Sequence, residues 1–185
     1  MVREELFRLK FPIGEFTKPE HISDHEISQW IAHIESFPSK VKELTDDLTV
    51  NQLNWKYRPE GWTIKQVVHH CADSHMNSLI RFKLALTEDT PTIKPYYEDR
   101  WANLVDGNDD NLEDTLYLLK GLHAKLTTLL RNLSPSDLLK EFVHPEHGKH
   151  FRLDETIGVY AWHCNHHLAH IKQALEYKGQ FNKTT

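Results

Sequence analysis

The feature that most constrains the fold of this chain is the helical spacing of its apolar residues. In the segment NLEDTLYLLKGLHAKLTTLLRNL, residues 111–133, leucines recur on one stripe of a helical wheel. The stripe consists of Leu112, Leu116, Leu119, Leu122, Leu126, Leu129 and Leu130. Because an apolar stripe must be buried against other elements, this segment predicts an amphipathic helix within a larger helical assembly.

An earlier segment predicts a second helix, over residues 23–37. Ser23 and Glu26 have the spacing of a capping box, and apolar residues follow them at helical intervals. Pro38 then interrupts the pattern. It either lies in a continuing, kinked helix or stands in the first turn of a short second helix, and the sequence leaves both alternatives open.

A third helix carries the first group of histidines. Thr63 and Gln66 form another capping box, which predicts a long helix from Ile64 to about Thr87. A loop rich in aromatic residues follows, over residues 88–109. Because it is too long for a simple linker, we expect this loop to pack over another part of the molecule as the wall of a pocket.

The last part of the chain predicts a hairpin and a fourth helix. The segment EFVHPEHGKHFRL is typical of a small hairpin around His147 and Gly148. Asp154 is expected to cap the last helix, which runs to about Tyr177 or Lys178 before Gly179. Together the segments predict an all-α fold: an antiparallel four-helix bundle with a small β-hairpin before the last helix, as one domain over residues 1–185.

Composition excludes two classes of partner. The 185 residues have a formal net charge of -5, without the basic excess that nucleic-acid binding needs. No segment approaches the length of a membrane span or of an apolar signal sequence, so we expect a cytoplasmic protein with no membrane partner. Cys71 and Cys164 lie among apolar residues of two expected helices and are predicted to be free buried thiols.

Four histidines in AWHCNHHLAHIK indicate a metal site on the last helix. On a helical wheel His163 and His167 border the apolar face, whereas His166 and His170 lean toward solvent. Residues four apart stack one turn apart, so two imidazoles can reach one metal ion. The candidate ligand pair is therefore His163 with His167, although the pattern H-x-x-x-H by itself is common and His166 with His170 has the same spacing.

A mononuclear catalytic site needs a third protein ligand. The segment VVHHCADSH offers His69, His70 and His75 on the helix that begins at Ile64. His75 lies on the apolar face, where a histidine is more often a hydrogen-bonded core residue than a ligand. His70 lies at the start of a polar stripe, which suits a wet pocket between helices. The stripe continues with Ser74, Asn77 and Arg81. The wheel favours His70 only slightly.

Three segments carry a family resemblance. GWTIKQVVHHCADSHMNSLIRFKLALTE, GVYAWHCNHHLAHI and FPIGEF resemble the YfiT-like metal-dependent hydrolases of the DinB superfamily, and the resemblance extends along nearly the whole chain. It implies a four-helix bundle that binds one zinc or nickel ion through His70, His163 and His167. This sequence departs from the expected pattern in having Cys164 and Asn165 between the last two ligands.

Three neutral imidazoles would leave the metal its full charge, which suits activation of water and predicts a metal-dependent hydrolase acting on a small molecule. Two alternatives remain. Relatives of this fold transfer low-molecular-weight thiols, so the resemblance also allows a bacillithiol-type S-transferase in which the metal binds a thiolate. A non-catalytic metal-binding protein is the other alternative.

Three polar residues near His70 are candidates for roles in catalysis. Asp73 is expected to orient a ligand, and Asn77 and Arg81 are expected to contact substrate, although Arg81 could equally pair with a carboxylate. The aromatic residues of the long loop are expected to cover the metal pocket or a dimer contact; they are Tyr96, Tyr97 and Trp101. The resemblance implies a homodimer.

Overall fold

The computed structural model describes residues 3–146 and 148–181. Four long helices make up most of this described chain: α2 (Asp24–Thr45), α4 (Ile64–Thr87), α6 (Glu113–Arg131) and α8 (Leu153–Tyr177). The shorter elements are α1 (Arg3–Lys10), α3 (Val50–Leu53), α5 (Glu98–Trp101), the 3-10 helix η1 (Asp106–Asn108), α7 (Pro135–Leu138), β1 (Glu141–His144) and β2 (Lys149–Arg152). The predicted four-helix bundle with a hairpin before the last helix is confirmed.

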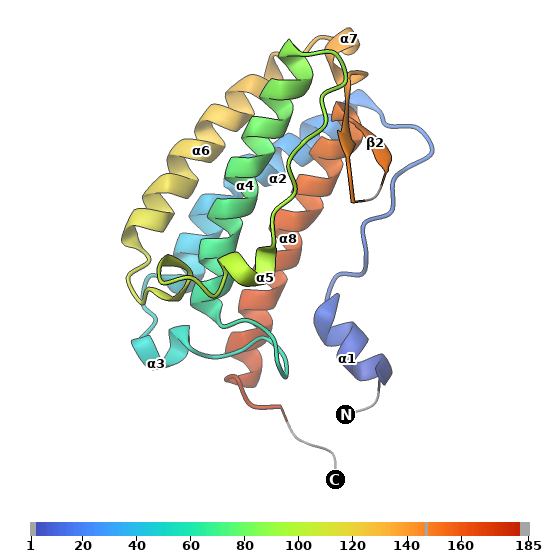
Figure 1. The fold of residues 1–185 in the computed structure, drawn as a ribbon. Helices are drawn as coiled ribbons and strands as arrows, with labels where there is room; N and C mark the ends of the chain where they lie inside the picture. The colour runs from blue at the N-terminus through green and yellow to red at the C-terminus, as the bar shows by residue number, and fades with distance from the viewer. Residues whose placement is uncertain (1–2, 147, 182–185) are drawn as a thin grey trace.

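The long helices form a closed ring in which α2 and α4 each pack against both α6 and α8. Figure 1 shows α2 and α8 running one way along the bundle and α4 and α6 running the other way. The antiparallel neighbours are thus α4 with α8 and α2 with α6. Helices α4 and α6 run in the same direction because residues 88–112 return along the whole bundle before α6 begins (Figure 1).

Helix α2 resolves the alternatives at Pro38. The capping box of Ser23 and Glu26 is formed, and the helix continues through Pro38 to Thr45. Phe37 and Pro38 are both buried. Apolar burial therefore keeps the segment helical although proline cannot donate the backbone hydrogen bond of its position.

Helix α8 begins differently from the prediction. Its N-cap is Arg152, which makes no capping bond through its side chain, and Asp154 lies inside the first turn. The reason is the hairpin: Arg152 is paired with Glu141 in the β-ladder, so the strand leads directly into the helix. The expected end is correct, since Lys178 and Gly179 both have positive φ values directly after Tyr177.

The hairpin and the long loop are joined. Ile93 donates its backbone N–H to the Val143 carbonyl at 3.0 Å, and Val143 donates to the Pro91 carbonyl at 2.9 Å. The expected turn residue His147 lies outside the described residues, whereas Gly148 adopts the positive φ of a tight turn. These bonds fix the start of the loop to β1, which packs against α4.

The buried core lies between the four long helices and includes both cysteines. Cys71 and Cys164 are free and almost fully buried, as predicted. Among the described residues, no helix combines the length and the apolar character that crossing a membrane requires.

Candidate metal centre

Three histidines meet where α4 and α8 pack together. His70 comes from α4, and His163 and His167 lie one turn apart on α8. The Nε2 atom of His163 lies 3.3 Å from Nε2 of His70 and 3.2 Å from Nε2 of His167. All three residues offer a nitrogen within 4.8 Å of the other two. The structure thus brings together the three residues that the family resemblance implied.

The two distances from Nε2 of His163 fit a tetrahedral metal ion. Zinc binds imidazole nitrogen at about 2.0–2.1 Å, so two nitrogens at neighbouring corners of its tetrahedron lie about 3.3 Å apart. Burial lowers the pKa of His70 to about 4 and holds the pKa values of His163 and His167 well below their ordinary range. The rings are therefore neutral at pH 7, as metal ligands must be.

Trp62 forms one wall of the site, a role that the sequence did not indicate. Its indole lies 4.6 Å from the His70 ring and 6.5 Å from the nearly parallel His167 ring. Trp62 directly precedes Thr63, whose capping box starts α4. Its position just before the cap of the histidine-bearing helix is the signal in the sequence that could have indicated this role.

The second wall comes from α4 and the long loop. Ser74 Oγ lies 3.5 Å from Nε2 of His163. The phenol of Tyr96 lies beside Ser74, and burial raises its pKa. Tyr96 also packs against Trp101, at 4.6 Å between ring centroids. His163 itself keeps some exposed surface, so this part of the helix seam still contacts solvent.

The three polar residues predicted beside His70 differ in what they contact. Asp73 is half-buried, and burial with the nearby charge of Asp106 raises its pKa to about 6. Asn77 donates its amide to the Asp73 carbonyl at 2.9 Å. Arg81 donates to the Tyr160 hydroxyl at 3.1 Å, and so bonds a phenol rather than the carboxylate that was the alternative.

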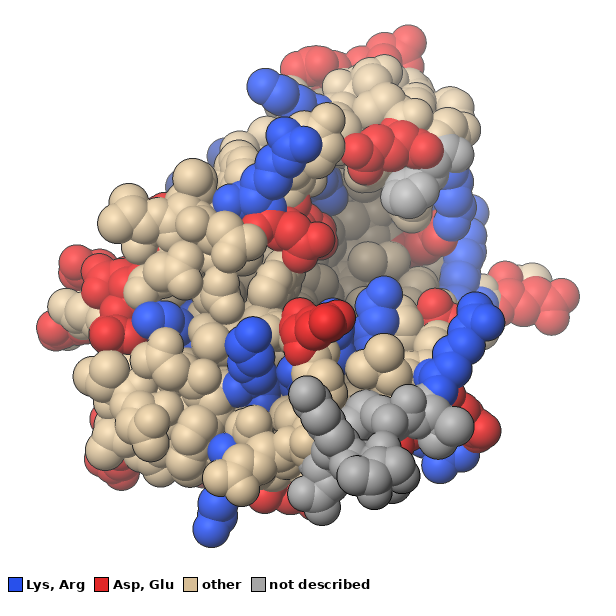
Figure 2. Space-filling model, turned by 60° about the horizontal axis from the view of Figure 1, so that its bottom comes forward, with Lys and Arg blue, Asp and Glu red and all other residues tan. Residues whose placement is uncertain are grey.

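Arg81 also lines a cavity of about 500 Å³ between the long loop and the hairpin. Its lining includes Tyr96, Tyr97, Glu98, His144 and Glu146. Figure 2 shows the molecule hollowed, with acidic and basic side chains around the rim of the hollow. The Tyr160 ring, whose hydroxyl accepts from Arg81, lies 6.0 Å from the ring of His163, so Tyr160 links Arg81 to the three-histidine group. The long loop is therefore the wall of a pocket, as the sequence predicted.

The prediction that His166 and His170 lean toward solvent is wrong. Both are buried, with 7% and 2% of their surface exposed. His170 stacks on Tyr57 at 3.7 Å, and His166 stacks on Trp162 at 4.4 Å. The N-terminal segment covers this face of α8, because Phe11 lies 5.8 Å from His166. A helical wheel cannot show such cover, since it comes from a distant part of the sequence.

A second group of buried side chains lies behind the first. It consists of His75, His123 and Cys164, whose ligand atoms also lie within 4.8 Å of one another. His75 is a hydrogen-bonded core residue, as predicted, and lies 3.0 Å from Nδ1 of His163. Sequence reasoning missed His123, because it stands inside the leucine pattern of α6.

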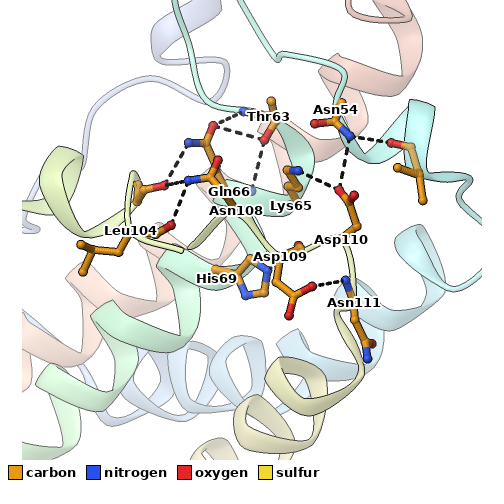
Figure 3. A network of polar contacts seen from close by, with 12 residues as sticks. Asn54, Thr63, Lys65, Gln66, His69, Leu104, Asn108, Asp109, Asp110 and Asn111 are labelled. Atoms are coloured by element: carbon orange, nitrogen blue, oxygen red, sulfur yellow. Dashed lines mark hydrogen bonds and ion pairs between the residues drawn. The ribbon is translucent and has the colours of Figure 1, made fainter. Parts of the chain in front are cut away.

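His69, the neighbour of His70, faces a different part of the molecule. Its ring nitrogens lie 2.8 Å from the Thr115 hydroxyl and 3.0 Å from the Asp109 carbonyl. Figure 3 shows it within a polar network that ties residues 104–111 to the first turns of α4. In the same network, Lys65 pairs with Asp110 at 2.7 Å. His69 therefore anchors the chain before α6 and takes no part in the three-histidine group.

A helical bundle with three convergent imidazoles at one seam is an arrangement suited to a mononuclear metal site. The chain belongs to the DinB superfamily, whose family model matches residues 33–171. The predicted family resemblance is thereby confirmed.

Two relatives and one solved structure agree with this assignment. The chain is 48% identical over 169 residues to a protein of Oceanobacillus iheyensis, covering 91% of this chain and 97% of that protein. It is 45% identical over 171 residues to YfiT of Bacillus subtilis, covering 92% and 96%. Both relatives carry the name "Putative metal-dependent hydrolase". The solved structure of Bacillus subtilis YfiT matches with a TM-score of 0.90 and 43% identity, over 94% of this chain and 99% of that one, and is described as having "an unusual four-helix bundle topology".

Proposed function

We propose that this protein is a metal-dependent hydrolase in which His70, His163 and His167 hold one zinc or nickel ion. The observation that carries the proposal is the convergence of three neutral imidazoles, in which Nε2 of His163 lies at the spacing of tetrahedral metal ligands from Nε2 of both His70 and His167. The names of the relatives support the same class of reaction.

When bound, the metal supplies Lewis-acid chemistry, because it lowers the pKa of coordinated water toward 7 and polarises a substrate oxygen. The chain's part is to present three neutral ligands, which leave the charge of the ion uncompensated. Trp62 screens the seam from bulk water on one side, over His70 and His167. The partly exposed His163 lies where solvent reaches the seam.

Arg81 is our proposed substrate-binding residue, since it lines the cavity and reaches the hydroxyl of Tyr160 beside His163. Asn77 is proposed to contact substrate through its side-chain oxygen, because its amide nitrogen already donates to the Asp73 carbonyl. Asp73 is proposed to position neighbouring groups rather than to react. The mixed charges of the cavity suit a small polar molecule.

The first experiment measures metal content by mass spectrometry on the untagged protein. We expect about one zinc or nickel ion per chain, lost in His70→Ala, His163→Ala and His167→Ala. His69→Ala and His166→Ala are matched controls, because both remove a buried histidine outside the three-nitrogen group, and both should keep the metal. Metal retained by the first three variants would contradict the ligand assignment, and a wild-type chain that takes up no metal would contradict the function.

A second experiment separates water from a thiol as the nucleophile. The metal-loaded protein is offered ester and amide substrates alone, and then electrophiles together with a low-molecular-weight thiol. Hydrolysis without thiol supports the proposal. Consumption of thiol with the electrophile, and no hydrolysis, would favour the S-transferase, whereas neither reaction would favour a non-catalytic metal-binding protein.

We further propose, from the family resemblance, that the protein is a single domain that works as a homodimer in the cytoplasm. Analytical ultracentrifugation tests the dimer, which should sediment with twice the mass of the 21.8 kDa chain. A monomer at micromolar concentration would contradict it.

A further inference from the structure

We propose that His75, His123 and His170 are positioning residues, which hold both α8 ligands with their Nε2 lone pairs turned toward the metal. The inference rests on the proposed function. Two chains of buried histidines carry it, and each chain ends on a backbone carbonyl that lacks its helical hydrogen-bond donor.

The first chain starts at His163 and crosses the whole bundle. His163 Nδ1 lies 3.0 Å from Nε2 of His75. His75 Nδ1 lies 2.8 Å from Nε2 of His123. His123 Nδ1 lies 2.6 Å from the carbonyl oxygen of Ile34. Each of the four long helices therefore supplies one member of the chain.

The terminal carbonyl determines which ring nitrogen of each histidine in this chain carries the proton. A carbonyl only accepts, so His123 must donate from Nδ1, and as a neutral ring it then accepts at Nε2. His75 must for the same reason donate from Nδ1 and accept at Nε2. His163 consequently donates from Nδ1, which leaves its Nε2 as the unprotonated nitrogen beside His70 and His167.

The Ile34 carbonyl is available because of Pro38. In an α-helix the carbonyl of residue 34 accepts from the N–H of residue 38, and proline has no N–H. Pro38 lies inside α2 and is buried. A proline that costs α2 one backbone hydrogen bond thus leaves an acceptor in the core, facing His123.

The second chain fixes the tautomer of His167 in the same way. His170 Nε2 lies 3.1 Å from the carbonyl oxygen of Lys10, and His170 Nδ1 lies 3.3 Å from Nδ1 of His167. Lys10 is the last residue of α1, so its carbonyl has no donor within the helix. His170 donates to it from Nε2 and accepts at Nδ1. His167 then donates from Nδ1 and keeps its Nε2 lone pair.

These chains differ from the usual support of a metal-binding histidine. Such a ligand mostly donates its second N–H to a carboxylate, a carbonyl or water, which fixes its tautomer and its orientation. Here the direct partner is a neutral histidine, so the ligand is oriented without a negative charge next to the metal. His75 and His123 use both ring nitrogens in the chain, and we therefore assign them to positioning rather than to a second metal site with Cys164.

The direct test is the tautomeric state of the histidines in the metal-free, full-length protein. Long-range proton–nitrogen correlation NMR on histidine labelled with nitrogen-15 distinguishes Nδ1–H from Nε2–H. We expect Nδ1–H at His75, His123, His163 and His167, and Nε2–H at His170. An Nε2–H tautomer at either α8 ligand would overturn the proposal. Because no metal is present, this result is independent of whether the proposed function is correct.

A paired test measures zinc affinity by competition with a chelator. His75→Phe is expected to weaken zinc binding about 10- to 100-fold, the usual effect of removing the partner of a ligand. His75→Gln, which can both donate and accept, should recover part of the loss. His69→Phe is the matched control on the same helix and should bind zinc as wild type does. Equal affinity in His75→Phe and His69→Phe would overturn the proposal, and if His75→Phe does not fold, the wild-type tautomers still decide it.

Discussion

Trp62 lies with its indole over the imidazole of His70, at 4.6 Å between ring centroids and a tilt of 49°. The same indole faces the ring of His167, at 6.5 Å and 17°. One aromatic side chain therefore contacts two candidate ligands from two different helices. Because Trp62 immediately precedes the N-cap of α4, the local structure that starts this helix also positions a wall of the metal centre.

Trp62→Ala should loosen both ligands and leave a gap over the site. We expect zinc binding to weaken about tenfold and the free energy of unfolding to fall by about 1–3 kcal/mol. Chelator competition and urea denaturation measure the two effects. Trp62→Phe keeps an aromatic ring and should lose less of both; a Trp62→Ala protein that binds zinc like wild type would show that the indole does not hold the ligands.

Acid should destabilise the metal-free protein through its buried histidines, and His123 allows a clear test. Burial lowers its pKa from 6.5 to about 4 in the folded chain. Between these values the unfolded chain binds a proton that the folded chain does not. The stability is therefore fully present above pH 6.5 and falls toward pH 4, by up to about 1.4 kcal/mol per pH unit for one histidine.

Urea denaturation of the metal-free protein at several pH values measures this slope. His123→Phe removes one such group, so its stability should fall less steeply with acid than that of wild type. The comparison of slopes is unaffected by any loss of stability that is constant with pH. Parallel curves for the two proteins would mean that His123 takes up no proton on unfolding.

Gly158 is expected to tolerate no side chain, although it lies within α8. A Cβ atom at this position would lie 2.9 Å from Cη2 of Trp30 and 3.0 Å from Cζ of Phe16. Gly158→Ala should therefore lower the free energy of unfolding by about 1–3 kcal/mol, because crowding in a packed interior outweighs the better helix propensity of alanine.

Gly121 is the matched control, since it also lies within a long helix and a Cβ there meets nothing within 4 Å. Gly121→Ala should raise the free energy of unfolding by about 0.5–1 kcal/mol. Opposite signs for the two substitutions in thermal or urea denaturation are the expected result. A stabilised Gly158→Ala would show that Trp30 and Phe16 can move aside.

The candidate ligands were predictable to different degrees. The wheel of α8 selected His163 and His167, since their place at the edge of the apolar face follows from local periodicity. The wheel of α4 favoured His70 only slightly, from its place at the start of a polar stripe, while His75 lies on the apolar face; the family resemblance made that choice. The structure assigns the two residues to successive layers, with His70 among the three converging nitrogens and His75 behind His163.

What the sequence by itself determined is local: where helices begin and end, and which face of each is apolar. The start of α4 follows from the capping box of Thr63 and Gln66, which involves residues three apart. Tertiary structure alone decided the burial of His170 and the role of His123. The Lys10 carbonyl, which hydrogen-bonds His170, lies 160 residues away in the sequence, and the Ile34 carbonyl, which hydrogen-bonds His123, lies 89 residues away. No periodic pattern within one helix contains such contacts, because they exist only once the four helices and the N-terminal segment have packed together.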